Sequence, residues 1–236
     1  MNQLILILLV TWLAGITAFW GGVLARLEGY AETEAKQELI HGVIAFGGGI
    51  LVAAVAFALV PEGISNLHPA LLAGTFCAGG LAFCRLDAYL GAKGGSKAQF
   101  MAMLMDFVPE AISLGAVFGH NQKLGILLAA FIGAQNLPEG FNSYREIVAS
   151  KVKPSTTMLL LLAASLLGPI AACTGYLLLQ NQPGLTAGIM TFASGGILYL
   201  IFQDIAPQTV MQRHWIPPLG AVLGFTIGML GKALLG

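Results

Sequence analysis

Eight apolar segments of about 20 residues each limit the folds that are open to this chain. A helix of that length spans the hydrocarbon core of a bilayer, so each segment predicts a membrane-spanning helix. Only 9% of the residues are charged, whereas soluble domains carry about 25%. The chain is therefore predicted to be an all-α, polytopic membrane protein whose single domain covers residues 1–236. The segments are residues 4–25, 39–61, 69–90, 100–118, 124–147, 156–179, 185–207 and 216–235.

Lysine and arginine gather on one side of this predicted bundle. Eight of them flank the connections that follow the odd-numbered spans, while only Lys123 and Lys232 flank the other side. Arg85 lies near the end of the third span. Because cytoplasmic loops are enriched in Lys and Arg, both termini are predicted to lie outside the cytoplasm. The eight are Arg26, Lys36, Lys93, Lys97, Arg145, Lys151, Lys153 and Arg213.

A short repeat links the second span to the seventh. Gly-Gly-Ile-Leu occurs at residues 48–51 and again at 195–198, followed by Pro61 and Pro207 respectively. The copies are an odd number of spans apart, so they are predicted to cross the membrane in opposite directions. Inverted repeats of this kind are typical of transporters, whose substrate site lies near the membrane midplane. Chance recurrence in a glycine-rich chain is the alternative.

Two motifs place acidic residues inside apolar spans. Residues 106–111 read Asp-Phe-Val-Pro-Glu-Ala, and residues 135–140 read Gln-Asn-Leu-Pro-Glu-Gly. In a helix, the first and fifth residues of each motif share one face. The proline between them removes a backbone donor. In lipid, such a break is tolerated only where the backbone faces protein or a wet cavity. The motifs therefore predict a polar site between the fourth and fifth spans.

A carboxylate at membrane depth costs a few kcal/mol or more and by default marks an ion or proton path. Three carboxylates close together would repel one another unless a cation lay among them. The predicted cation ligands are Asp106, Glu110, Gln135 and Glu139. The alternative is a pair of protonated buried acids that hydrogen-bond to neighbouring helices.

Other features narrow the function. Cys77, Cys84 and Cys173 all lie in apolar segments, so no disulfide framework is expected. The net charge is zero, which gives no sign of nucleic-acid binding. Neither His-Glu-x-x-His nor Gly-x-Ser-x-Gly occurs, so the chain is not expected to be an enzyme. Gln203 and Asp204 in the seventh span are candidates for a cation path or for interfacial residues that bond the backbone.

Together these features resemble the ZIP (zinc/iron-regulated transporter-like) family of divalent-metal transporters, in its bacterial form. Residues 135–140 closely match the Gln-Asp-x-Pro-Glu-Gly motif of that family, and residues 106–111 partly match its His-Asn-x-Pro-Glu-Gly motif. The resemblance implies an inverted 3+2+3 helix arrangement. It also implies uptake of Zn, Fe, Mn or Cd through the bacterial inner membrane towards the cytoplasm. The metal ion and the bilayer are then the expected partners, with no tightly bound cofactor.

The departures from the family motifs predict one metal site rather than two. Relatives with a second metal hold it largely through an Asn, an Asp and a Glu, where this chain has Phe107, Asn136 and Gly168. Only Asn136 could still contribute a side-chain oxygen. Asp106 replaces the usual His, so the remaining ligands are all oxygens and favour a harder metal. A ZIP-like protein that senses or scaffolds without transport, an intramembrane metalloenzyme, and a homodimer remain open alternatives.

Overall fold

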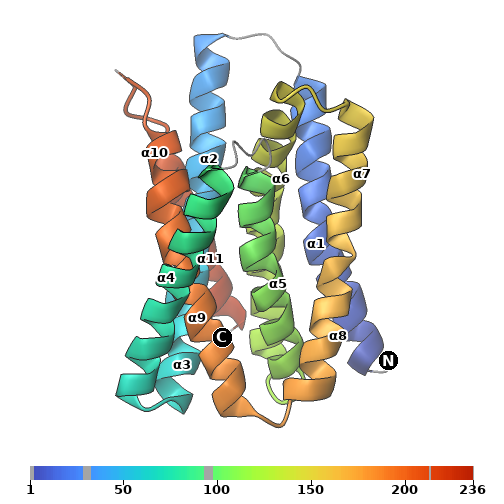
Figure 1. Ribbon diagram of the computed structural model, residues 1–236, viewed down its shortest axis with the longest axis vertical. Helices are drawn as coiled ribbons and strands as arrows, with labels where there is room; N and C mark the ends of the chain where they lie inside the picture. Colours follow the sequence, from blue (N-terminus) through green and yellow to red (C-terminus); the bar gives the residue numbers. More distant parts are fainter. Residues whose placement is uncertain (1–2, 29–32, 93–97, 213, 236) are drawn as a thin grey trace.

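The structure is a computed structural model that describes residues 3–28, 33–92, 98–212 and 214–235. Within these residues the helices run antiparallel and form one bundle (Figure 1). Seven helical crossings are long and apolar enough to span a membrane, and a shorter apolar helix, Leu219–Leu235, adds an eighth. The predicted all-α membrane fold is confirmed.

Five crossings are continuous α-helices, and three contain an irregularity. The continuous helices are α1 (Gln3–Glu28), α4 (Pro69–Ala92), α5 (Ala98–Phe118), α6 (Gln122–Ala149) and α11 (Leu219–Leu235). The second crossing runs through α2 (Glu34–Ala54), a π-helical turn η1 (Val55–Leu59) and α3 (Val60–Asn66). The sixth runs through α7 (Pro154–Ser165) and α8 (Leu167–Leu179). The seventh runs through α9 (Pro183–Leu200), a π-helical turn η2 (Ile201–Ile205) and α10 (Ala206–Thr209).

The two copies of the Gly-Gly-Ile-Leu repeat share the same irregularity. The turns η1 and η2 end at Leu59 and Ile205, each just before a proline, Pro61 or Pro207. Proline supplies no backbone N–H, so the carbonyls of the preceding turn must find other donors, and a wider turn provides them. The α2 and α9 crossings also run in opposite directions (Figure 1). Both observations are what an inverted repeat predicts.

The chain termini lie at the same end of the bundle (Figure 1). The amide of Gln3 donates to the carbonyl of Phe118, at the α5–α6 connection. Lys232, near the end of α11, lines a cavity together with Glu62 and Lys123. We call this the terminal end of the bundle.

The opposite end carries most of the cations, and we call it the Lys/Arg-rich end. Its described cations include Arg26, Lys36, Arg145, Lys151 and Lys153. Glu28 joins two of them, since its carboxylate lies 3.3 Å from the ammonium of Lys36 and 3.1 Å from the guanidinium of Arg145. Lys93, Lys97 and Arg213, which the sequence also placed on this side, lie outside the described residues.

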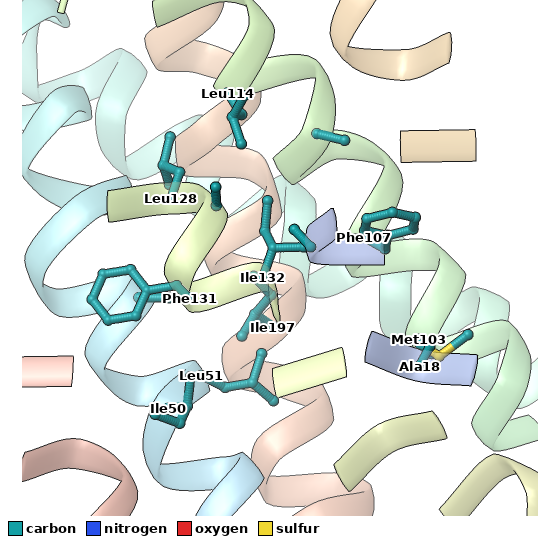
Figure 2. Packing of buried hydrophobic residues seen from close by; sticks show 14 of the residues in the cluster. Ala18, Ile50, Leu51, Met103, Phe107, Leu114, Leu128, Phe131, Ile132 and Ile197 are labelled. Atoms are coloured by element: carbon teal, nitrogen blue, oxygen red, sulfur yellow. The ribbon is translucent and has the colours of Figure 1, made fainter. Parts of the chain in front are cut away.

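Glycines let α6 approach α1 closely near the second motif. A Cβ atom at Gly21 would lie 2.0 Å from the carbonyl oxygen of Leu137, and one at Gly140 would lie 2.1 Å from that of Ala18. Buried aliphatic and aromatic side chains pack around the middle of α5 and α6 (Figure 2). The two helices that carry the acidic motifs are therefore held in a tightly packed part of the bundle.

Candidate cation site

The acidic motifs lie on the neighbouring helices α5 and α6. Pro109 and Pro138 are inside these helices, which continue through both positions without the π-helical turns seen in η1 and η2. Each proline leaves the carbonyl one turn earlier, at Met105 or Ala134, without its usual N–H donor. These carbonyls belong to the same short stretches as the acidic side chains.

Hydrogen bonding fixes the register of the two helices. Gln135 Nε2 donates to Glu110 Oε2 at 2.6 Å. One turn closer to the Lys/Arg-rich end, the carboxyl groups of Asp106 and Glu139 are close enough to interact. Asp106 Oδ1 also accepts the backbone N–H of Phe107 at 2.7 Å. The structure thus brings together the four cation ligands that were predicted from the sequence, which are Asp106, Glu110, Gln135 and Glu139.

These four side chains are withdrawn from the surface of the chain. The exposed fraction is 3% for Asp106, 1% for Glu110, 0% for Gln135 and 6% for Glu139. Side chains with this burial are ordinarily paired, and an unpaired buried acceptor costs about 1–3 kcal/mol. Burial of these four side chains therefore favours the binding of a cation or of a hydrogen-bond donor among them.

Several oxygens in the cluster have no such partner. Glu110 Oε1, Gln135 Oε1 and Glu139 Oε2 are buried without a hydrogen bond, and so is Oδ1 of the adjacent Asn136. Carboxylate and carbonyl oxygens are the ligands that hard divalent cations prefer. The arrangement therefore offers acceptors from both helices to a cation and little to an anion.

The carboxylates alone do not form a finished ligand shell. Across the described residues, no three His, Cys, Asp or Glu side chains converge closely enough to hold a metal ion. A cation bound here would need the amide oxygen of Gln135, water, or a small rearrangement to complete its coordination.

The next residue of α5 faces a different environment. The Phe107 side chain is 2% exposed, and its ring reaches between α1 and α8. A Cβ atom at Gly15 would lie 2.9 Å from Phe107 Cζ, and one at Gly168 would lie 2.7 Å from it. Asn136 turns towards α1, where its Nδ2 donates to the carbonyl of Ala14 at 3.3 Å. The positions that the resemblance assigns to a second metal are thus largely filled by an aromatic ring.

Gln203 and Asp204 lie away from this cluster. Both belong to η2, where Gln203 is exposed and Asp204 is half-buried. The charged neighbours of Asp204 are Asp87 and Glu146, not the four site residues. Gln203 and Asp204 remain candidates for a cation path near the Lys/Arg-rich end.

A small cavity of about 10 Å³ lies beside Glu139, and that volume is close to the least that one water requires. It is lined by residues of α2, α6, η2 and α10. At its edge, Asn142 Nδ2 donates to Gln208 Oε1 at 3.0 Å. Sequence reasoning missed Asn142, Gln208 and the buried Ser143. The i+4 spacing of Ser143 from Glu139 was the available signal for one of them. The lining residues are Ile44, Gly47, Gly48, Pro138, Glu139, Asn142, Ile205 and Gln208.

Comparison with known proteins gives one informative similarity. No protein-family model matches the chain. The zinc transporter GufA of Myxococcus xanthus is 33% identical over 125 residues, which is 52% of this chain. The matched stretch spans about half of that relative, 49% of its length. Over half its length, then, this eight-crossing chain with a buried acidic cluster is similar to a zinc transporter.

Proposed function

We propose that this chain is a ZIP-type transporter that moves a divalent metal cation across a membrane towards the cytoplasm. The cation would bind at one site formed by Asp106, Glu110, Gln135 and Glu139. The observation that carries the proposal is the set of buried, unpartnered oxygens on α5 and α6. The similarity to a zinc transporter supports a divalent metal as the substrate.

The ligand set suggests how the cation is chosen. All four side chains offer oxygen, which suits Mn²⁺, Mg²⁺ and Ca²⁺ better than it suits Zn²⁺. The general affinity order still places Zn²⁺ above Mn²⁺, so an oxygen site narrows that difference without necessarily reversing it. The proposed substrates are Zn²⁺, Fe²⁺, Mn²⁺ and Cd²⁺. Carboxylates must be deprotonated to act as ligands, so binding should release protons and weaken in acid.

The proposed direction of movement follows from the resemblance to the ZIP family, and the cavity beside Glu139 supplies a candidate exit for the cation. The cavity of about 10 Å³ beside Glu139 is lined on its other sides by Asn142 and Gln208, which belong to the part of the bundle nearer the Lys/Arg-rich end. The excess of Lys and Arg assigns that end to the cytoplasm, and the termini to the outer side. A cation leaving Glu139 through this cavity would enter the cytoplasm.

Uptake by the purified protein in liposomes tests the proposal. The Glu139→Gln variant keeps the size of the side chain but removes its charge, and it should abolish uptake. Glu34→Gln is the matched control, because the Glu34 side chain is 76% exposed and lies at the start of α2. Normal uptake by Glu139→Gln would place the site elsewhere. Wild-type protein that binds metal without uptake would instead favour the sensing or scaffolding alternative.

A further inference from the structure

Ser143 has an unusual hydroxyl. Its side chain is fully buried, at 0% exposure, and its Oγ has no hydrogen-bond partner. Every other buried Ser or Thr in the described residues donates to a backbone carbonyl. Ser194 on α9 is a typical case, since it is equally buried and donates to the carbonyl of Met190 at 2.8 Å. The Ser143 hydroxyl does not make the corresponding bond to Glu139.

Ser143 also continues the line of cation ligands along α6. Gln135, Glu139 and Ser143 are spaced four residues apart, so they follow one another on one side of the helix. Each step advances about 6 Å along the axis. Because α6 runs towards Arg145, which pairs with Glu28 at the Lys/Arg-rich end, Ser143 is one turn closer than Glu139 to that end.

The facing helix, α5, offers no polar side chain opposite Ser143. The antiparallel register pairs Glu110 with Gln135 and Asp106 with Glu139. Continuing that register by one turn brings Ala102 opposite Ser143, and alanine has no polar group. Along the side of α6 that carries Gln135 and Glu139, the Ser143 hydroxyl is therefore the next side-chain oxygen, and the Asn142 amide beside it lines the cavity.

We propose that the Ser143 hydroxyl is a transient ligand that receives the cation from Glu139 on its way to the Lys/Arg-rich end. The inference rests on the proposed function and adds a step to it. A neutral hydroxyl binds a divalent ion weakly, so Ser143 should speed the departure of the ion without adding much to its affinity. Asn142, the neighbouring residue, already lines the cavity into which the ion would pass.

The first test separates rate from affinity. Ser143→Ala should lower the initial rate of Zn²⁺ or Mn²⁺ uptake by about five- to tenfold, the scale of one lost buried polar contact. The dissociation constant of the metal, measured by calorimetry on the detergent-solubilised protein, should stay within about twofold of the wild-type value. Ser194→Ala is the matched control, because it removes a hydroxyl that is already bonded to backbone, and its uptake should be normal. Wild-type uptake by Ser143→Ala would overturn the proposal.

A second variant keeps the proposal testable if Ser143→Ala folds poorly. Ser143→Cys, in a chain whose Cys77, Cys84 and Cys173 are changed to Ala, places a soft ligand at the same point. Cd²⁺ should then give the absorbance of a cadmium–thiolate bond and should be retained instead of released. Adding Glu139→Gln should weaken this capture, because the ion would reach the thiol through Glu139. A variant that binds Cd²⁺ at the central cluster without this absorbance would refute the role of Ser143.

The same measurements separate this inference from the proposed function. If wild-type protein gives no uptake but Ser143→Cys captures Cd²⁺ in a Glu139-dependent way, transport is refuted and the cation path is retained. If uptake is normal in wild type and in Ser143→Ala, transport stands and the Ser143 step is refuted. Wild-type protein that binds no cation refutes both.

Discussion

Two adjacent residues of α5 meet opposite environments. On the side facing α6, Asp106 joins a cluster that contains unpaired buried oxygens. On the side facing α1 and α8, the Phe107 ring fills the space beside Gly15 and Gly168. The first side is packed tightly enough to exclude solvent yet leaves its polar groups unsatisfied. The second is satisfied by apolar contact alone. The proposal of one cation site therefore rests on this difference between the two sides of α5.

The contrast predicts that changes on the two sides affect different properties, and the largest effect is expected at Glu110. Glu110→Gln removes a charge but keeps the shape of the side chain. Metal affinity should fall by more than about 100-fold, because even the loss of a residue that only supports a ligand typically costs about 10–100-fold. Thermal stability without metal should not fall, since the variant removes one of several crowded carboxyl groups. Calorimetric titration and thermal unfolding check both statements. A large loss of stability with unchanged affinity would reverse the assignment.

Phe107→Ala should show the opposite pattern. Removing a buried phenylalanine side chain typically lowers the free energy of unfolding by about 3–5 kcal/mol, through lost packing and the cavity that remains. Metal binding should keep the proposed stoichiometry of one ion per chain, because Phe107 contributes no ligand through its side chain. Chemical denaturation in detergent and metal titration of the folded fraction measure the two quantities. Loss of the bound metal in folded Phe107→Ala would show that the two sides of α5 are not independent.

Restoring polar residues on the side of α5 that faces α1 and α8 tests whether the Phe107 ring alone prevents a second cation site there. Gly168→Glu by itself should be destabilising, because even its Cβ would lie 2.7 Å from Phe107 Cζ and its charge would be buried. Combining it with Phe107→Asn should relieve the clash and restore two polar ligands beside Asn136. Metal analysis should then give more than one ion per chain. A double variant that folds but still binds a single ion would show that other residues exclude the second one.

Local chemistry made much of this arrangement predictable. Helical periodicity alone predicted that Asp106 and Glu110 lie on one face of α5. Glu110 indeed faces α6, because it accepts a hydrogen bond from Gln135. The fit of Phe107 between Gly15 and Gly168 could not be predicted, because it depends on how three distant segments pack. Nor could the free hydroxyl of Ser143, since most helical serines bond their own backbone. The prolines indicated a break in the helix, but not whether the break would become a π-helical turn.

The smallest effect is expected at Asp106, where the change alters the kind of ligand and not the number of sites. One oxygen of Asp106 accepts the N–H of Phe107, which leaves the other oxygen as the freer ligand for a cation. Asp106→His would replace that oxygen with an imidazole nitrogen, which Zn²⁺ accepts more readily than Mn²⁺ does. The preference for Zn²⁺ over Mn²⁺ should rise by about tenfold, equivalent to about 1.4 kcal/mol. Competition uptake with Zn²⁺, Mn²⁺, Fe²⁺ and Cd²⁺ measures the ranking.

Asp106→Asn is the control, because it removes the charge while keeping oxygen, and it should weaken the binding of all four metals without reordering them. An unchanged ranking in Asp106→His would mean that Asp106 supports Glu139 but does not itself touch the cation.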